Sequence, residues 1–92
     1  MKQRIYRFPA NQRAQAATLS DQLLKVIEEA REVLQAYENN EGDERIIEEL
    51  WDSIQADEGA LRKFPLSKVI KGFILVKLKS NKRGDYLTVR GK

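Results

Sequence analysis

Apolar residues recur in the first half of the chain with the spacing of an amphipathic helix. From residue 19 to residue 37 they follow one another at steps of three and four positions. These positions are Leu19, Leu23, Val26, Ile27, Ala30, Val33, Leu34 and Tyr37. Good helix formers follow Pro9, so we expect this helix to begin as early as Ala10. The Asn-Asn-Glu-Gly sequence of residues 39–42 is typical of a helix end.

A second helix is predicted from about residue 44 to residue 63, with Asp43 as its N-cap and Pro65 beyond its end. One stripe of it is apolar except for one acid: Ile47, Leu50, Trp51, Ile54, Glu58 and Leu61. The opposite face holds two acids followed by small residues: Glu49, Asp52, Ala56, Gly59 and Ala60. Such a face lets another helix approach closely. Because the connection is short, the two helices form an antiparallel hairpin.

The pattern after Pro65 fits two elements. Ser67 is a possible cap for a helix, whereas Gly72 and the β-branched residues after it also suit a strand, so residues 70–78 stay open between the two. We favour the helix, because a lone strand has no partner. A turn is expected at residues 81–85 and an extended tail at residues 86–92. The fold class is therefore all-α, in one domain spanning residues 1–92, with a core at about 10–80 and a basic tail at about 80–92.

The amino-acid composition excludes several kinds of metal site and catalytic site. The 92 residues include no cysteine and no histidine, which excludes thiolate and imidazole metal sites and the nucleophilic triads that need either residue. No apolar run approaches the length of a membrane span, so we expect a cytoplasmic protein without a membrane partner. A chain this short buries only about 60–65% of its unfolded surface. We therefore expect a homodimer or homotetramer that pairs hairpins into a four-helix-bundle core.

Charge is segregated along the chain. Residues 14–62 carry thirteen acids and four cations, whereas residues 63–92 carry nine cations and one acid. Acidic surfaces attract metal cations, and basic segments attract phosphates or nucleic acid.

The acids of the hairpin fall into two pairs. Positions three apart share a helix face, so Glu29 projects with Glu32, and Glu49 projects with Asp52. Both pairs lie at similar heights above the loop, so four carboxylates converge with the oxygen ligands that Mg²⁺ or Mn²⁺ prefers. The alternative is a solvated acidic face. A solvated face is disfavoured because like charges three or four positions apart on a helix repel one another, and both helices of the hairpin contain such pairs.

The two acidic segments resemble a known motif. Glu28-Glu29-Ala30-Arg31-Glu32, sixteen residues and then Glu49-Leu50-Trp51-Asp52 are similar to the E-E-x-x-E … E-x-x-D pattern of the MazG family. These are all-α nucleoside triphosphate pyrophosphohydrolases. The basic segment from Lys77 to Tyr86 resembles the basic segment of small members of that family.

The resemblance implies a reaction and a set of roles. It implies hydrolysis of a nucleoside triphosphate between the α and β phosphates, giving a monophosphate and pyrophosphate. Metal ligands would be Glu29, Glu32, Glu49 and Asp52, and the acids beside them, Glu28 and Glu48, would position water or accept its proton. Candidate contacts to the phosphates are Lys79, Asn81, Lys82 and Arg83.

Two other classes of function fit the same chain. One is a small helical nucleic-acid-binding protein whose basic tail makes the contacts and whose acidic hairpin is only a scaffold. The other is an oligomeric relative without catalytic activity.

Overall fold

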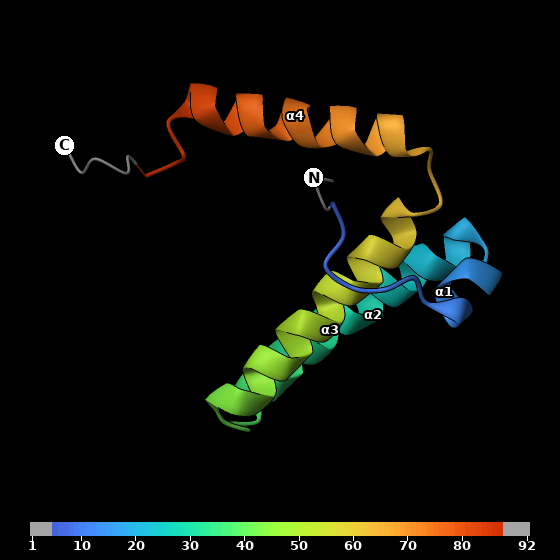
Figure 1. Ribbon diagram of the computed structural model, residues 1–92. Helices are drawn as coiled ribbons and strands as arrows, with labels where there is room; N and C mark the ends of the chain where they lie inside the picture. Colours follow the sequence, from blue (N-terminus) through green and yellow to red (C-terminus); the bar gives the residue numbers. More distant parts are fainter. Residues whose placement is uncertain (1–4, 88–92) are drawn as a thin grey trace.

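The computed structural model describes residues 5–87, and every regular element in that range is a helix (Figure 1). The elements in order are α1 (Gln12–Ala16), α2 (Leu19–Glu38), α3 (Asp43–Leu61) and α4 (Leu66–Arg83). The predicted all-α fold class is confirmed, and residues 70–78 lie within a helix.

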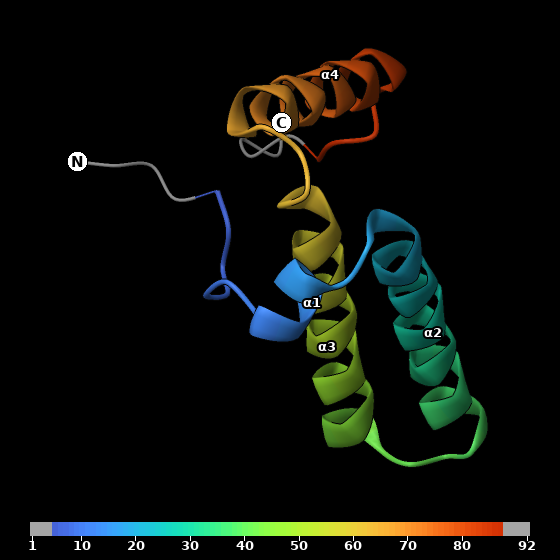
Figure 2. The same ribbon diagram turned by 90° about the vertical axis from the view of Figure 1, so that its right-hand side faces the viewer.

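Helices α2 and α3 form the predicted antiparallel hairpin and lie side by side along their length (Figures 1 and 2). Their connection turns sharply, because Asn40 and Gly42 adopt positive φ angles of 55° and 97°. Gly42 is the N-cap of α3, so the prediction that Asp43 caps this helix is wrong. Asp43 instead lies in the first turn, where a carboxylate interacts favourably with the helix dipole.

The helix expected to begin at Ala10 is divided in two. Ala17 and Thr18 are extended, and the Thr18 hydroxyl accepts a hydrogen bond from the Asp21 amide at 3.1 Å, which starts α2 anew. Lys63 donates hydrogen bonds to the carbonyl oxygens of Gln15 and Ala17, which satisfies the open end of α1. The threonine cap and this lysine therefore hold α1 as a separate short helix.

Small and polar residues form the inner face of the hairpin. Among them Gln22 donates a buried hydrogen bond from Nε2 to the Ala56 carbonyl at 3.0 Å. A Cβ atom at Gly59 would lie 2.7 Å from Gln22 Nε2 and 3.0 Å from the Ala14 Cβ. The small-residue face of α3 thus admits both α1 and α2, as the sequence predicts.

The apolar stripes face outward. Ile47, Leu50 and Trp51 on α3 are 52%, 46% and 44% exposed, and most large apolar side chains of α2 are equally open. Among the described residues no side chain is fully buried. The Cα radius of gyration is 15.8 Å, whereas a compact chain of this length has about 12 Å. Within residues 5–87 the buried apolar side chains are therefore few and small, four alanines and Val69.

Glu58 is the polar exception in the outer stripe, and it holds the N-terminal segment. Its two carboxylate oxygens accept hydrogen bonds from the backbone amides of Arg7 and Phe8 at 2.9 and 3.0 Å. Arg62 donates to the Phe8 carbonyl at 2.7 Å. The Phe8 ring meets the Trp51 ring edge-on at 6.1 Å between centroids. Arg7 and Phe8 are thus fastened to the outer side of α3.

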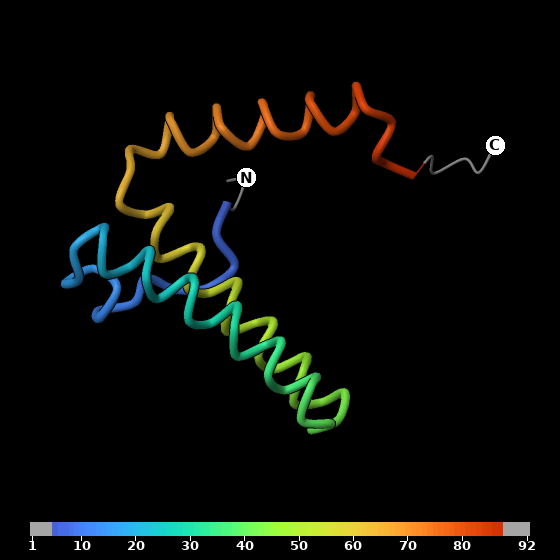
Figure 3. Tube along the Cα trace, turned by 180° about the vertical axis from the view of Figure 1, so that it is seen from behind, coloured from blue at the N-terminus to red at the C-terminus, as the bar shows by residue number. Residues whose placement is uncertain are grey.

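Helix α4 stands apart from the hairpin and packs little against the other helices (Figure 3). Its N-cap is Pro65 rather than Ser67, and it continues to Arg83. Residues 81–83 of the turn predicted at 81–85 are therefore helical, and the chain turns only at Gly84 and Asp85. It ends where Gly84 takes a left-handed conformation and the Asp85 amide donates to the Ser80 carbonyl at 2.9 Å. Of the predicted tail, residues 86 and 87 are not helical, and residues 88–92 lie outside the described range. None of the helices within residues 5–87 has the length and apolarity required to cross a membrane.

Candidate metal and substrate site

Carboxylates of α2 and α3 meet across the hairpin. Oxygen atoms of Glu29, Glu49 and Asp52 lie within 4.8 Å of one another. A second group with the same spacing consists of Glu28, Glu29 and Glu32. The structure therefore brings together the four predicted ligand residues as two overlapping groups that share Glu29.

The two central carboxylates are buried and each has a cation one turn earlier in its helix. Glu29 is 7% exposed and Glu49 is 4% exposed. Lys25 Nζ lies 2.7 Å from Glu29 Oε2, and Arg45 Nη2 lies 2.6 Å from Glu49 Oε2. Each ion pair spans four positions of one helix, the spacing at which helical side chains meet.

The same two cations also reach the exposed neighbouring acids. Lys25 Nζ is 3.6 Å from Glu28, and Arg45 Nη1 is 2.7 Å from Glu48. The hydrogen bond to Glu29 raises the pKa of Lys25, and the hydrogen bond to Glu48 together with the charge of Glu49 raises the pKa of Arg45. Both cations therefore stay charged at neutral pH.

Negative charge remains in excess in this cluster. The charge of Glu29, and then loss of hydration, raises the pKa of the Glu32 carboxyl, with further contributions from Glu49 and Glu28. One buried oxygen, Glu49 Oε1, has no hydrogen-bond partner within residues 5–87. A buried acceptor without a partner costs about 1–3 kcal/mol, and more when it is charged. The cluster therefore has one oxygen, Glu49 Oε1, that accepts no hydrogen bond from any positive group of the described residues.

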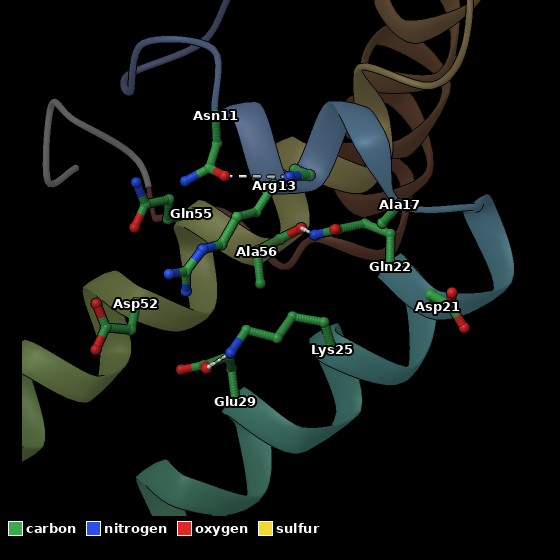
Figure 4. A pocket seen from close by; sticks show the side chains of 11 residues that line it. Asn11, Arg13, Ala17, Asp21, Gln22, Lys25, Glu29, Asp52, Gln55 and Ala56 are labelled. Carbon is green, nitrogen blue, oxygen red and sulfur yellow. Dashed lines mark hydrogen bonds and ion pairs between the residues drawn. The ribbon is translucent and has the colours of Figure 1, made fainter.

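A pocket of about 540 Å³ opens beside the carboxylates (Figure 4). Glu29 and Asp52 line one end, and the pocket is also lined by Arg13 of α1 and by Asn11, the N-cap of α1. Gln55, half-buried on α3, completes the wall near Asp52. The volume is within the range of about 300–1,000 Å³ that small-molecule sites occupy.

The predicted phosphate contacts lie elsewhere in the single chain. Lys79, Asn81, Lys82 and Arg83 are exposed on the last turns of α4. Arg83 pairs with Asp85 at 2.8 Å. Because α4 stands apart from the hairpin, the fold of one chain does not bring these side chains to the carboxylates (Figure 1).

Three cations near the carboxylates were not among the predicted site residues. For Lys25 and Arg45 the sequence holds a usable pattern, since each precedes a glutamate by four helical positions. Arg13 has no such pattern. Its place at the pocket depends on the break at Ala17 and on the packing of Ala14 against Gly59.

No known protein family model matches the chain, and neither the curated proteins nor the solved structures include a match. The structure shows a small all-α protein. The resemblance to the MazG motif rests on the motif residues alone.

Proposed function

We propose that this chain is a Mg²⁺- or Mn²⁺-dependent hydrolase that cleaves nucleoside triphosphates between the α and β phosphates. The observation that carries the proposal is the buried Glu49 carboxylate, whose Oε1 lacks a partner within residues 5–87 and which lies beside Glu29 and Asp52. The spacing of these acids, which resembles the MazG motif, supports the same reaction.

The residues present fit a divalent cation. Carboxylate oxygens are the ligands of Mg²⁺ and Mn²⁺, and three of them from two helices lie within 4.8 Å of one another. A cation there would supply the charge that the unpaired Glu49 Oε1 lacks. The proposed ligands are Glu29, Glu32, Glu49 and Asp52. When bound, such an ion polarises a phosphoryl oxygen and lowers the pKa of water.

The neighbouring acids have a separate role in the proposal. Glu28 and Glu48 are exposed, and each shares its cation with a buried carboxylate. An exposed carboxylate beside the ligands accepts the proton of the attacking water as the water oxygen bonds to phosphorus. The bond from phosphorus to the bridging oxygen then breaks, and pyrophosphate leaves.

The proposal includes a second copy of the chain. The chain exposes 7986 Å², whereas a compact monomer of 10.7 kDa exposes about 5,500 Å². That excess per chain exceeds the roughly 800 Å² that each partner buries in a stable interface of standard size. Pairing two hairpins through their outer stripes forms a four-helix core and leaves the polar inner faces to hold the carboxylates. In such a homodimer or homotetramer, α4 of one copy is available to the site of another.

The test is pyrophosphate release from a panel of nucleoside triphosphates with Mg²⁺ or Mn²⁺. Asp52→Asn is the main variant, because Asp52 is exposed and its replacement leaves the packing intact. Glu49→Gln tests the buried ligand. Glu44→Gln is the matched control, since it removes an exposed acid from the first turn of the same helix.

The expected result is metal-dependent release in the wild type and in Glu44→Gln, and loss of at least about 100-fold in both ligand variants. Equal release by the wild type and by Asp52→Asn would overturn the proposal. Absence of release from every nucleotide, combined with salt-dependent retardation of a nucleic acid, would favour the binding function of the basic α4 instead.

A further inference from the structure

We infer that Arg13 binds a phosphate group of the substrate in the pocket beside the carboxylates. The inference rests on the proposed function, because it assigns a part of the polyphosphate to that same site. It adds a contact from α1, a helix to which the sequence motif gives no role.

Arg13 is placed by packing that involves its neighbours. Ala14 is buried against Gly59 of α3, with 3.0 Å between the Ala14 Cβ and the position of a Cβ at Gly59. The Asn11 side chain caps α1 by accepting from the Ala14 amide at 3.1 Å. The α1 backbone is thus fixed on α3, and Arg13 extends from it into the pocket toward the end that holds Asp52 and Glu29 (Figure 4).

The guanidinium of Arg13 is free to accept a ligand. It makes neither an ion pair nor a side-chain hydrogen bond with any other residue of the described range 5–87, although it shares a pocket with Asp52 and Glu29. Lys25, the other cation of this pocket, is bound to Glu29 at 2.7 Å. Arg13 is therefore the cation of this pocket whose hydrogen-bond donors remain unused within that range.

The chemistry of this pocket suits a polyphosphate carried with a divalent cation. The carboxylate end attracts the cation, and a guanidinium presents paired donors that match two oxygens of one phosphate. A polyphosphate that spans from the cation to the guanidinium places its negative oxygens against a positive charge at both contacts. The pocket volume of about 540 Å³ also leaves space for the rest of a nucleotide, next to the amides of Asn11 and Gln55.

This assignment differs from a contact made by α4. The α4 cations lie away from the pocket of their own chain, whereas Arg13 lies at that pocket. Removal of Arg13 should therefore weaken substrate binding even where assembly is unchanged.

The experiment measures steady-state kinetics of Arg13→Gln with the best nucleotide of the panel, and calorimetric binding of inorganic tripolyphosphate with Mg²⁺. Arg13→Lys keeps the charge without the paired donors. Lys71→Gln is the matched control, because it removes one exposed cation from α4 away from the pocket. Circular dichroism and Mn²⁺ titration establish that folding and the metal site are unchanged.

We expect Arg13→Gln to raise KM about 10-fold or more with kcat nearly unchanged, and to weaken tripolyphosphate binding similarly. Arg13→Lys should lie between it and the wild type, and Lys71→Gln should match the wild type. An active enzyme whose KM is unaltered by Arg13→Gln would overturn the inference and leave the proposed function standing.

The reverse case is equally decisive. If the wild type hydrolyses no nucleotide, the proposed function fails and tripolyphosphate binding alone tests Arg13. Weaker binding by Arg13→Gln than by Lys71→Gln would then support an anion site at Arg13. Equal binding by the two variants, or absence of binding by the wild type, would overturn it.

Discussion

Arg45 holds one oxygen of the buried Glu49 carboxylate at 2.6 Å, while the other oxygen has no partner in the described part of the chain. This half-paired carboxylate connects stability with the proposed metal site. Arg45 is itself half-exposed and shared with Glu48 and Glu41, so its charge is divided among three acids. A divalent cation at Glu49 would therefore meet a site that the protein has only partly neutralised.

The first prediction concerns Arg45→Gln. Without divalent cations this variant should melt several degrees below the wild type, because Glu49 stays buried with its main counter-ion removed. Mn²⁺ should recover more stability in the variant than in the wild type, since the cation no longer competes with a guanidinium. Thermal melts with chelator and with Mn²⁺ measure both effects.

The control for this prediction is Arg31→Gln, an exposed cation of α2 that forms no ion pair within residues 5–87. It should melt like the wild type in chelator. A variant Arg45→Gln that is as stable as Arg31→Gln, and that gains nothing extra from Mn²⁺, would contradict the argument.

The second prediction concerns pH. Asp57 is exposed, but partial loss of hydration raises its pKa above the ordinary value of 3.8. Between pH 3.8 and the raised pKa, the folded state therefore holds more of this proton than the unfolded state does. Stability therefore rises as the pH falls through the raised pKa toward 3.8, and the penalty is constant above that pKa. Asp57→Asn removes the penalty. At neutral pH it should raise Tm by up to about 3 °C, and the gain should vanish below pH 3.8.

Thermal melts of both proteins across this pH range supply the measurement. Asp43→Asn is the contrasting variant, because it removes a favourable carboxylate from the first turn of α3 and should lower Tm at neutral pH. A gain from Asp57→Asn that stays constant with pH would show that burial of the charge is not its cause.

The third prediction concerns Glu58. Its carboxylate accepts two backbone hydrogen bonds, from Arg7 and Phe8, so Glu58→Ala should release the N-terminal segment. We expect faster tryptic cleavage after Arg7 and a red-shifted emission of Trp51, because the Phe8 ring leaves its contact with the indole. Because both hydrogen bonds are made to a charged carboxylate, we expect their loss to destabilise the folded state by about 1–3 kcal/mol.

Glu44→Ala serves as the comparison for Glu58→Ala, because it removes an exposed acid of α3 that has no contact with the N-terminal segment. If both variants are cleaved after Arg7 at the wild-type rate, Glu58 does not hold the segment.

The apolar periodicity of the sequence was sufficient to predict the hairpin, but not to predict which faces of its two helices meet. Steps of three and four locate a stripe on a helix, yet they do not say which neighbour that stripe meets. Here Ala56, Gly59 and Ala60 allow the close approach of α1 and α2, and the larger residues Leu50 and Ile54 are left outside. Within one chain, close backbone approach thus determines the pairing.

The acidic half of the site was predictable from spacing, whereas the pocket was not. Residues three apart share a face, so the meeting of Glu29 with Asp52 follows from the helices and the short loop. The pocket also needs α1, whose position depends on long-range contacts to α3. Such contacts leave no periodic pattern in the sequence.

The fourth prediction concerns assembly. Leu50 lies in the outer stripe and is 46% exposed in the single chain, so a glutamate there would cost little if the chain stayed monomeric. In a four-helix core formed by two copies the same glutamate is buried without a partner, which costs several kcal/mol. Leu50→Glu should therefore dissociate the proposed oligomer, with a matching loss of helical structure, because the described part of the single chain buries only a few small apolar side chains.

Sedimentation equilibrium and circular dichroism together test this prediction. The wild type and Glu44→Gln should sediment at twice or four times the chain mass of 10.7 kDa, and Leu50→Glu at one chain mass with reduced helicity. Asp57→Asn lies on the same helix and should remain associated. A wild type that sediments as a folded monomer would refute the pairing of hairpins through their outer stripes, and it would also remove the route by which α4 of another copy reaches the carboxylates.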